Sequence, residues 1–335
     1  MLPKLIVTIP ALNEAETIGE VIREIPREIA GVSRVEVLVL DDGSRDATVE
    51  AAFAAGADYV VSNGVNRGLA FTFKRTVDEA LARGADIIVN TDADNHYDQT
   101  RIPELIQPIL QHNADIVVGS RELSSLKMRW ANKNGNRVAN FIMQRLLRIP
   151  GIDVSSGYRA YSRLAALSLN VLSPHTYTHE TLFNAIDRRL KVVSIPLAAR
   201  HVERPSRLIS SVPKHIWRAG IVILQSVLRY RPFQVYGTLG MVLVLAGAVP
   251  FLRYLYFLQM GDSDGHLQSL IAGSVLMFLG AQLFVVGLLA RAIGWNRQLL
   301  EDILYRLRDD ASANRPATVS PIYAPEHQNG RSKVA

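Results

Sequence analysis

The chain has 335 residues, of which 48% are hydrophobic, and that length is enough for about two domains. It contains no cysteine, which excludes disulfides, cysteine-ligated zinc and thiol catalysis. The formal net charge of +6 and the isoelectric point near 9.6 suit an anionic partner such as phosphate, nucleic acid or an acidic membrane surface.

Residues 1 to about 210 alternate short apolar runs with helical patterns. The apolar runs predict strands at 5–9, 35–40, 59–61, 87–91 and 116–118. The patterns between them predict helices at 14–28, 47–55, 70–83 and 102–111. This alternation is typical of an α/β domain with a mostly parallel sheet and helices on both faces. Ligands of such sheets bind outside the carboxyl ends of the strands.

Three polar clusters, at 10–14, 41–44 and 92–95, follow predicted strands and are therefore expected at one edge of the sheet. Asp92 and Asp94 stand one residue apart at the end of an apolar run. Two carboxylates in that place can share Mg²⁺ or Mn²⁺ with a diphosphate, and the cation then neutralises a leaving nucleoside diphosphate. A surface turn is the alternative, because Asp and Asn also favour turns.

A nucleotide needs further acceptors for its base and ribose, and Glu14, Asp41 and Asp42 are placed to supply them. Residues 42–44 are equally compatible with a plain turn that caps the next helix. The glycine-rich dinucleotide fingerprint and the GxxxxGK[ST] phosphate loop are both absent from the sequence. Their absence weakens the dehydrogenase and ATPase interpretations.

The last third of the chain has two long segments without a charged residue, at 235–252 and 267–290. Because a membrane-spanning helix needs roughly 20 apolar residues, we expect transmembrane helices at 234–258 and 267–291. Two buried helices of a soluble core are the alternative. The loop at 261–265 has no Lys or Arg, whereas arginines flank the outer ends of both spans. The positive-inside rule then places the N-terminal α/β domain and both termini in the cytoplasm, at the cell membrane.

The expected organisation divides the chain into consecutive segments. They are a catalytic domain at 1–211, an amphipathic membrane-interface helix at 212–232, transmembrane helices at 234–258 and 267–291, a juxtamembrane helix at 295–309 and a disordered tail at 311–335. Gly237, Gly240 and Gly247 give the first span a small-residue face. Such a face suits packing against another helix, including one from a second copy in a homo-oligomer.

Basic residues cluster after the predicted sheet, namely Arg121, Arg129, Lys133, Arg137, Arg200, Arg204 and Arg207. Arginine binds phosphate through a planar fork of donors. A phosphate acceptor with a second pKa of about 6 is largely ionised at neutral pH, so it can attack a sugar carbon without a dedicated general base. For any single arginine, a structural ion pair is the alternative. Acidic lipid headgroups explain the basic residues near the spans better than nucleic acid does.

Six short motifs resemble, in their order and spacing, the family 2 glycosyltransferases with the GT-A fold, specifically the polyprenyl- or dolichyl-phosphate glycosyltransferases. The motifs lie at 9–14, 39–44, 66–69, 92–94, 119–121 and 153–159. They extend over most of residues 5–210, and the two C-terminal spans also match membrane-anchored members of the group. The resemblance implies a Rossmann-like α/β GT-A domain with a mostly parallel sheet, followed by an interface helix and two transmembrane helices.

The resemblance also implies roles, position by position. Asp92 and Asp94 are implied to hold Mg²⁺ or Mn²⁺ and, with Arg121 and Arg137, to be the catalytic residues. The donor is implied to contact Pro10, Ala11, Asn13, Glu14, Asp41 or Asp42, Asn66, Gly68, Asp92, Ala93 and Asp94. The acceptor phosphate and the sugar are implied to contact Arg121, Arg137, Ser156, Gly157, Arg159, Glu180, Arg204, Ser206 and Arg207. For Glu180, helix capping is the alternative.

The sequence departs from the family pattern after the paired carboxylates, where Asn95, His96 and Tyr97 replace a Leu-Gln-His type of segment. His96 is interpreted as a neighbour of the metal, a contact to the donor sugar or a surface side chain. The segment at 204–207 also departs, because it replaces a Gly-x-Ser-Lys type of sequence. These departures bear on the identity of the donor more than on the type of reaction.

The implied activity is the inverting transfer of one sugar from a UDP- or GDP-sugar to a polyprenyl (dolichyl or undecaprenyl) phosphate at the cytoplasmic membrane face, for cell-envelope glycans or protein glycosylation. A processive polysaccharide synthase of the same fold is one alternative. That group uses a QxxRW segment, however, and none of the three tryptophans ends one. A non-enzymatic membrane scaffold or nucleotide sensor that kept the fold is the other alternative.

Overall fold

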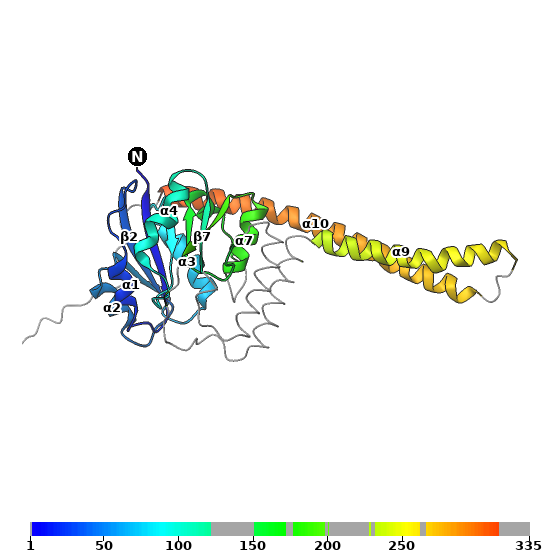
Figure 1. Cartoon of the computed structure of the whole chain (residues 1–335), viewed down its shortest axis with the longest axis horizontal. Helices are drawn as coiled ribbons and strands as arrows, with labels where there is room; N and C mark the ends of the chain where they lie inside the picture. Colours follow the sequence, from blue (N-terminus) through cyan, green and yellow to red (C-terminus); the bar gives the residue numbers. More distant parts are fainter. Residues whose placement is uncertain are drawn as a thin grey trace, which may run out of the picture. The chain divides into compact units, whose positions relative to one another are not determined.

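A computed structural model describes residues 2–121, 151–171, 177–197, 200, 228, 232–261 and 266–314. The chain divides into two compact units, of which the first comprises Met1–Val212 with Leu304–Ala335 and the second Pro213–Ile303. The first unit is an α/β domain, and the second holds most of two long helices (Figure 1).

The described residues of the first unit build a seven-stranded mixed sheet in the order β3-β2-β1-β4-β6-β5-β7. Its strands are β1 (Lys4–Ala11), β2 (Arg34–Asp41), β3 (Tyr59–Ser62), β4 (Ile87–Asn90), β5 (Ile116–Arg121), β6 (Arg159–Ser162) and β7 (Val192–Leu197). Only β6 runs against its neighbours in this sheet. The prediction of a mostly parallel α/β sheet is therefore confirmed, as are its five strands. Two strands, β6 and β7, were not expected.

Helices cover both faces of the sheet. They are α1 (Ile18–Glu24), α2 (Thr48–Ala54), α3 (Leu69–Ala82), α4 (Ile102–Leu110), α6 (Arg163–Ser168) and α7 (Thr178–Asp187), with a short 3₁₀ turn, η1, at Gln99–Arg101. On one face α1 and α4 pack on alternate residues of the strands, such as Val7 and Val89. Burying one such side chain contributes roughly 1.5–3 kcal/mol, so this alternation fixes the register of the sheet.

One helix is shorter than predicted. The pattern predicts a helix over 14–28, but α1 begins only at Ile18 and ends at Glu24. Ile25 is already extended (φ −67°, ψ 120°), because the residue before a proline is pushed out of the helical region and Pro26 follows it. Residues 14–17 instead form a turn, in which the Thr17 amide donates to the Glu14 carbonyl at 3.2 Å.

The register of the sheet brings the polar clusters to one edge. Ala11 pairs with Asp41, Asp41 with Ser62, and Asn90 with Arg159. Because β6 is antiparallel, its first residue lies beside the last residue of β4, so the connection that leads into β6 reaches the same edge. This edge, formed by the carboxyl ends of the parallel strands, is where ligands of open α/β sheets bind.

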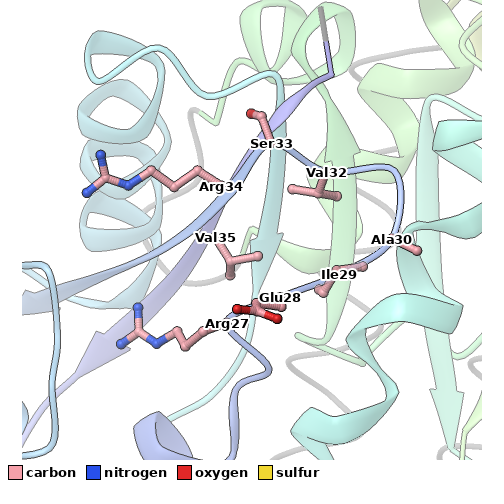
Figure 2. Close-up of a pocket in the computed structure, with 8 residues that line it drawn as sticks. All are labelled: Arg27, Glu28, Ile29, Ala30, Val32, Ser33, Arg34 and Val35. Atoms are coloured by element: carbon pink, nitrogen blue, oxygen red, sulfur yellow. The ribbon is translucent and has the colours of Figure 1, made fainter.

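A recess of about 350 Å³ lies at the opposite edge, around the connection from α1 to β2 (Figure 2). It is lined by Arg27, Glu28, Ile29, Ala30, Val32, Ser33, Arg34 and Val35. The recess is at the amino end of β2 and contains none of the residues that the sequence singles out. We do not assign it to the functional site.

Two long helices follow the sheet domain, α9 (Pro232–Gln259) and α10 (Leu267–Asn314). Within the described residues these two are long and apolar enough to cross a membrane, by length and composition. The expected separation of a span at 267–291 from a second helix at 295–309 is not seen, because α10 runs through Gly294 without a break. It also continues to Asn314, past the expected start of the tail at 311. The expected interface helix at 212–232 lies almost wholly outside the described residues.

The predicted small-residue face of the first span packs against α10 of the same chain. A β-carbon on Gly240 would lie 2.6 Å from the carbonyl oxygen of Gly280, and one on Gly247 would lie 2.7 Å from that of Gly273. Glycine is required at both levels, because any side chain would meet backbone. The face is thus occupied within the chain, and it is not a free surface on which a homo-oligomer would form.

The far end of α10 belongs to the sheet domain. Arg308 donates to the Leu169 carbonyl at 2.7 Å and lies 3.3 Å from the Asp78 carboxylate. Arg163 at the start of α6 pairs with Asp309 at 3.1 Å. These contacts hold the last turns of α10 against α3 and α6.

Candidate active site

The paired acids lie in a tight turn directly after β4. The Thr17 hydroxyl donates to the Ala93 carbonyl at 2.8 Å, which ties this turn to the start of α1. Asn95 adopts a left-handed conformation with φ 58°, which asparagine tolerates better than most residues. The His96 amide donates to Asp94 Oδ1 at 3.3 Å, and His96 Nδ1 lies 2.8 Å from Asp94 Oδ2. His96 therefore neighbours the second acid directly.

A buried polar cluster lies behind Asp92. The Asn90 side-chain amide donates to the Gly157 carbonyl at 2.9 Å and to the Tyr177 hydroxyl at 3.1 Å. The Tyr177 ring stacks on Phe73 with a centroid distance of 3.9 Å. Burial raises the pKa of the Tyr177 phenol well above its usual range, and the negative charge of Asp92 adds to the shift. The phenol therefore stays neutral at any physiological pH.

The two acids at the end of β2 organise the neighbouring loops. Asp41 accepts from the Ser62 hydroxyl at 2.7 Å and from the Ser44 amide at 3.0 Å. Asp42 accepts from the amides of Arg67 and Gly68, each at 2.9 Å. Both carboxylates are buried, and both are bonded to protein donors. A contact of either one with a nucleotide stays a prediction, but each also has a structural role that the sequence did not reveal.

Close packing of these loops requires glycine at one position. Gly43 has φ 81°, and a β-carbon on it would lie 2.6 Å from the backbone of Val65. Asn13, also left-handed with φ 55°, accepts from the Arg45 amide at 2.8 Å. Asn66 accepts from the Gly68 amide at 3.0 Å. The loops after β1, β2 and β3 are thereby locked together at the predicted donor edge.

The remaining predicted donor residues lie on this same edge. Pro10 and Ala11 are the last residues of β1, and both are buried. The Glu14 amide donates to the Thr48 hydroxyl at 2.9 Å, and its carboxylate accepts from Thr17 at 3.2 Å. The sequence motifs at 10–14, 41–42, 66–68 and 92–94 are therefore neighbours in the fold.

The motif before β6 is built into the interior. The Ser156 hydroxyl donates to the Gly119 carbonyl at 2.6 Å. Arg159 has no exposed surface, and its guanidinium donates to the carbonyls of Ser156, Val154 and Thr178 and to the Thr181 hydroxyl. All of its nitrogens have protein partners. Through these bonds Arg159 fastens the loop to the start of α7, and its expected contact with an acceptor stays a prediction.

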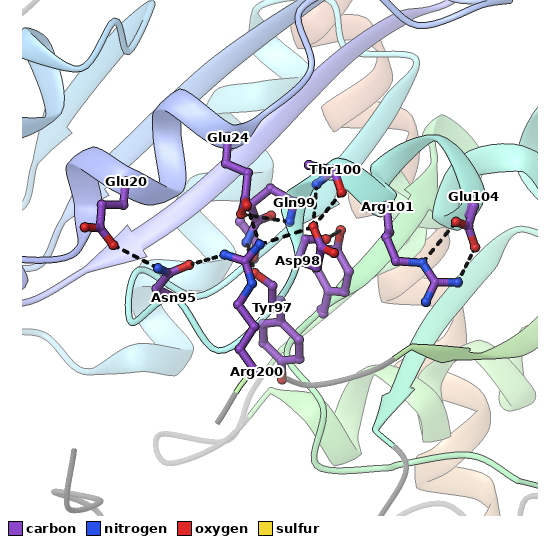
Figure 3. A network of polar contacts seen from close by, with 12 residues as sticks. Glu20, Glu24, Asn95, Tyr97, Asp98, Gln99, Thr100, Arg101, Glu104 and Arg200 are labelled. Carbon is purple, nitrogen blue, oxygen red and sulfur yellow. Dashed lines mark hydrogen bonds and ion pairs between the residues drawn. The ribbon is translucent and has the colours of Figure 1, made fainter. Parts of the chain in front are cut away.

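Arg200 has a similar structural place, although the sequence groups it with the phosphate-binding arginines. It donates to Asn95 Oδ1 at 3.0 Å and pairs with Glu24 and, at 3.4 Å, with Asp98 (Figure 3). Its amide also donates to the His96 carbonyl at 2.9 Å. The hydrogen bond to Glu24 raises the pKa of the Arg200 guanidinium. Arg200 thus clamps the turn that carries Asp94 onto α1.

Several predicted acceptor residues fall outside the described part of the chain, namely Arg137, Arg204, Ser206 and Arg207, together with Arg129 and Lys133. Arg121 ends β5 at the functional edge, where its backbone pairs with Leu197. Glu180 lies in the first turn of α7 and is buried. Their proposed contacts with an acceptor stay predictions.

The residues present fit a hard divalent cation that shares its ligands with a substrate. Among the described residues, no three or more His, Asp or Glu side chains are grouped to hold a metal by themselves. Asp92 and Asp94 are partly exposed, and Asp94 has an imidazole beside it. One or two carboxylates completed by substrate phosphates and water are the usual protein environment of Mg²⁺, so a diphosphate would have to supply the remaining ligands.

The comparison with known proteins decides the class of this domain. The family model Glycosyl transferase family 2 matches residues 6–167, which contain the donor edge and both acids. Residues 6–167 form a family 2 glycosyltransferase domain. The fold agrees, because the domain resembles the crystal structure of glucosyl-3-phosphoglycerate synthase from Mycobacterium tuberculosis, in complex with Mn²⁺, UDP and glucosyl-3-phosphoglycerate. That match has a TM-score of 0.52 at 25% identity and covers 66% of this chain and 79% of that one. The predicted GT-A fold is confirmed.

Two relatives of known name are also similar in sequence to this chain. Glycosyltransferase AglJ of Haloferax volcanii is 27% identical over 85% of this chain and 91% of its own length. The polyprenol monophosphomannose synthase of Mycolicibacterium smegmatis is 27% identical over 57% of this chain and 76% of its own length. The match to AglJ reaches well beyond the domain and into the region of the long helices.

Sequence reasoning missed Asn90 and Tyr177 as parts of the site, and it grouped Arg200 with phosphate-binding arginines rather than with the turn that carries Asp94. Asn90 looks like the last residue of a strand, and Tyr177 and Arg200 are far along the chain from the acids that they neighbour. No local pattern marks such residues, because pairing of β4 with β6 and the placement of α7 bring them in. The short strand β6, Arg-Ala-Tyr-Ser, is not an apolar run, so the apolar pattern did not predict it.

Proposed function

We propose that this glycosyltransferase transfers a single sugar from a nucleoside-diphosphate sugar to a polyprenyl phosphate at the cytoplasmic face of a membrane, with inversion at the anomeric carbon. The observation that carries the proposal is the placing of Asp92 and Asp94 at the carboxyl end of β4 in a family 2 domain followed by two membrane-length helices. The two acids bear on the donor, and the two long helices bear on the acceptor.

The donor side is supported by the edge that the loops after β1, β2, β3 and β4 share. A divalent cation held by Asp92 and Asp94 would neutralise the leaving diphosphate. The loops held by Asp41, Asp42 and Asn13 would then form the wall against which the nucleoside rests. The Mn²⁺ and UDP bound to the synthase of similar fold support the same class of ligand. Whether the base is uracil or guanine is left to experiment.

The acceptor side is supported by the apolar helices and by the printed activities of relatives. The relative from Mycolicibacterium smegmatis is named for polyprenol monophosphomannose synthesis, and another, from Micrococcus luteus, is an undecaprenyl-phosphate mannosyltransferase. A phosphate oxygen of the lipid would form the new bond to the anomeric carbon as the bond to the nucleoside diphosphate breaks. Because that phosphate is largely ionised at neutral pH, the reaction needs no dedicated base.

The orientation in the membrane follows from the charges at the ends of the helices. Arg291, Arg297, Arg306 and Arg308 follow the apolar part of α10, whereas the joining loop has neither Lys nor Arg. The positive-inside rule supports a cytoplasmic glycosyltransferase domain with both termini on the same side. A soluble nucleotide sugar and the phosphate end of the lipid then reach the enzyme from the same side.

The decisive experiment is a transfer assay with the full chain in detergent or lipid nanodiscs. UDP- and GDP-sugars are each incubated with polyprenyl phosphate and Mg²⁺ or Mn²⁺, and the anomeric configuration of the glycolipid is read by NMR. Polyprenol without a phosphate is the matched control and should accept nothing. If folded, nucleotide-binding protein makes no glycolipid with any donor, the acceptor in this proposal is wrong.

A further inference from the structure

A glycine, Gly157, lies directly behind the first acid. A β-carbon on Gly157 would lie 2.8 Å and 3.0 Å from the two carboxylate oxygens of Asp92, and 2.9 Å from the Tyr177 hydroxyl. Contacts below 3.0 Å are not tolerated, so both neighbours would have to give way. Gly157 does not have a positive φ, which shows that the space, and not the backbone conformation, requires glycine here.

The two neighbours differ in their freedom to move. Tyr177 is 1% exposed, its ring is stacked on Phe73, and its hydroxyl accepts from Asn90. Arg159 also holds the start of α7 through the Thr178 carbonyl at 2.7 Å. Asp92 is only partly buried and lies two residues beyond the last residue of β4. A side chain at position 157 would therefore displace mainly the carboxylate, while the tyrosine, which is held by its packing, would shift less.

We propose that Gly157 and Tyr177 are positioning residues for Asp92, in which the glycine leaves room for the carboxylate and the fixed phenol forms the polar surface behind it. Neither residue is assigned a contact with the cation or the substrate. The inference rests on the proposed function, because the carboxylate that they position is the one proposed to hold the cation. It assigns Gly157 to the support of the donor site, whereas the sequence pattern placed it with the acceptor.

The physical consequence is a preorganised ligand. A cation shared between two carboxylates and a diphosphate is sensitive to the direction in which each carboxylate points. A displaced Asp92 could still exist as an acid on a folded protein, but it would bind the cation less well. The proposal therefore predicts a defect in cation affinity rather than in folding or in nucleotide binding without metal.

The test measures Mn²⁺ affinity directly, from the loss of the free Mn²⁺ EPR signal on titration of the full chain in the presence of saturating UDP or GDP, whichever the wild type binds. Gly157→Ala should weaken Mn²⁺ binding about tenfold or more, and Tyr177→Phe, which keeps the stacked ring, should weaken it by a smaller factor. The Mn²⁺ concentration for half-maximal turnover should rise in parallel, while the KM for the acceptor should not.

Two control variants make the same kinds of substitution far from Asp92. They separate the effect of the position from the effect of the substitution itself. Gly19→Ala adds the same methyl group in α1, where it would meet only the flexible end of Arg23 at 3.3 Å. Tyr59→Phe removes a phenol whose neighbour is also an acid, Glu36, at the amino edge of the sheet. Both should bind Mn²⁺ like the wild type. Thermal unfolding of each variant shows whether it is folded, and Tyr177→Phe carries the test if Gly157→Ala does not fold.

Two outcomes would overturn the inference, and they are distinguishable. Wild-type affinity for Mn²⁺ in both folded site variants would show that Asp92 is not positioned by these residues, and it would leave the proposed function intact. Failure of the wild type itself to bind Mn²⁺ with either nucleotide would remove the cation from the proposed function, and the inference would fail with it.

Discussion

The glycosyltransferase domain buries its large apolar side chains, whereas the pair of long helices exposes many of its own. In the domain, Val7, Ile88 and other aliphatic residues of the strands are fully buried. In α9, Leu245 is 62% exposed and Val249 is 69% exposed, whereas Gly240 and Gly247 are buried. At these glycines the two helices meet backbone to backbone, whereas the large side chains Leu245 and Val249 lie on the outside.

The difference agrees with the proposal that the domain lies in water and the pair of helices in lipid. In water, burying apolar surface drives packing, so large side chains go inside. In lipid that force is absent between helices, and close backbone contact through small residues takes its place. Glycine thus has two uses in this chain. Between α9 and α10 it brings two backbones together, and at position 157 it makes room for a functional carboxylate.

The largest expected effect is chemical and is confined to the glycosyltransferase domain. Asp92→Asn should lower turnover about a thousandfold, ~4 kcal/mol, because the uncharged amide is a poor ligand for the cation. The measurement is the initial rate of glycolipid formation at saturating donor. Asp86→Asn, which changes an exposed acid at the amino end of the strand that precedes Asp92, is the control and should keep its activity. A retained rate in Asp92→Asn would show that Asp92 does not hold a cation that the reaction needs.

The next effect tests the other region. Gly280→Leu in α10 should destabilise the pair of helices by about 3 kcal/mol, because its β-carbon would lie 2.6 Å from the Gly240 carbonyl. Gly294→Leu changes the same residue type in the same helix, but its β-carbon meets nothing within 4 Å. It should be neutral or slightly stabilising, since leucine favours helix. Thermal unfolding in detergent distinguishes the two, and equal melting temperatures would show that the helices do not pack this way.

The sequence predicts those features of the two regions whose residues form a pattern within one segment of the chain. Asp92 and Asp94 could be found because two acids at the end of an apolar run form a pattern within one segment. The long helices were found for the same reason, since a span is a continuous apolar run. Neither prediction needs knowledge of what lies across the fold.

The rest of the site depends on contacts between distant segments. Arg159 was expected to contact a phosphate, because its motif does not show that Val154, Thr178 and Thr181 would use its donors. Arg200 was grouped with basic residues near the membrane, and its partners Glu24 and Asp98 are remote in sequence. The small residues of α9 suggested a contact with another helix, but only the structure identified that helix as α10. The sequence shows which residue types are present, but it does not show which distant residues each of them contacts.

A smaller effect is expected from the clamp on the turn after Asp94. Arg200→Ala should lower turnover about tenfold, because Asn95 and Glu24 lose the guanidinium that fixes the turn, and only the backbone bond to the His96 carbonyl remains (Figure 3). Arg101→Ala is the matched control, since Arg101 is nearby but pairs with Glu104 at the start of α4. If the two variants lose activity equally, the clamp has no specific role. Cation affinity should fall only in Arg200→Ala.

The smallest expected effect concerns the C-terminal end of α10, which contacts the glycosyltransferase domain. Arg308 is the residue of α10 that contacts Asp78 and the Leu169 carbonyl on the glycosyltransferase domain. Since a partly exposed ion pair contributes about 1 kcal/mol or less, Arg308→Ala should lower the melting temperature of the domain only slightly, and Arg306→Ala, which changes an exposed arginine of the same helix, not at all. The sharper readout is proteolysis, because loss of this contact should free the last turns of α10 and speed their cleavage in Arg308→Ala alone. Equal cleavage of both variants and the wild type would mean that the end of α10 belongs with the long helices and not with the domain.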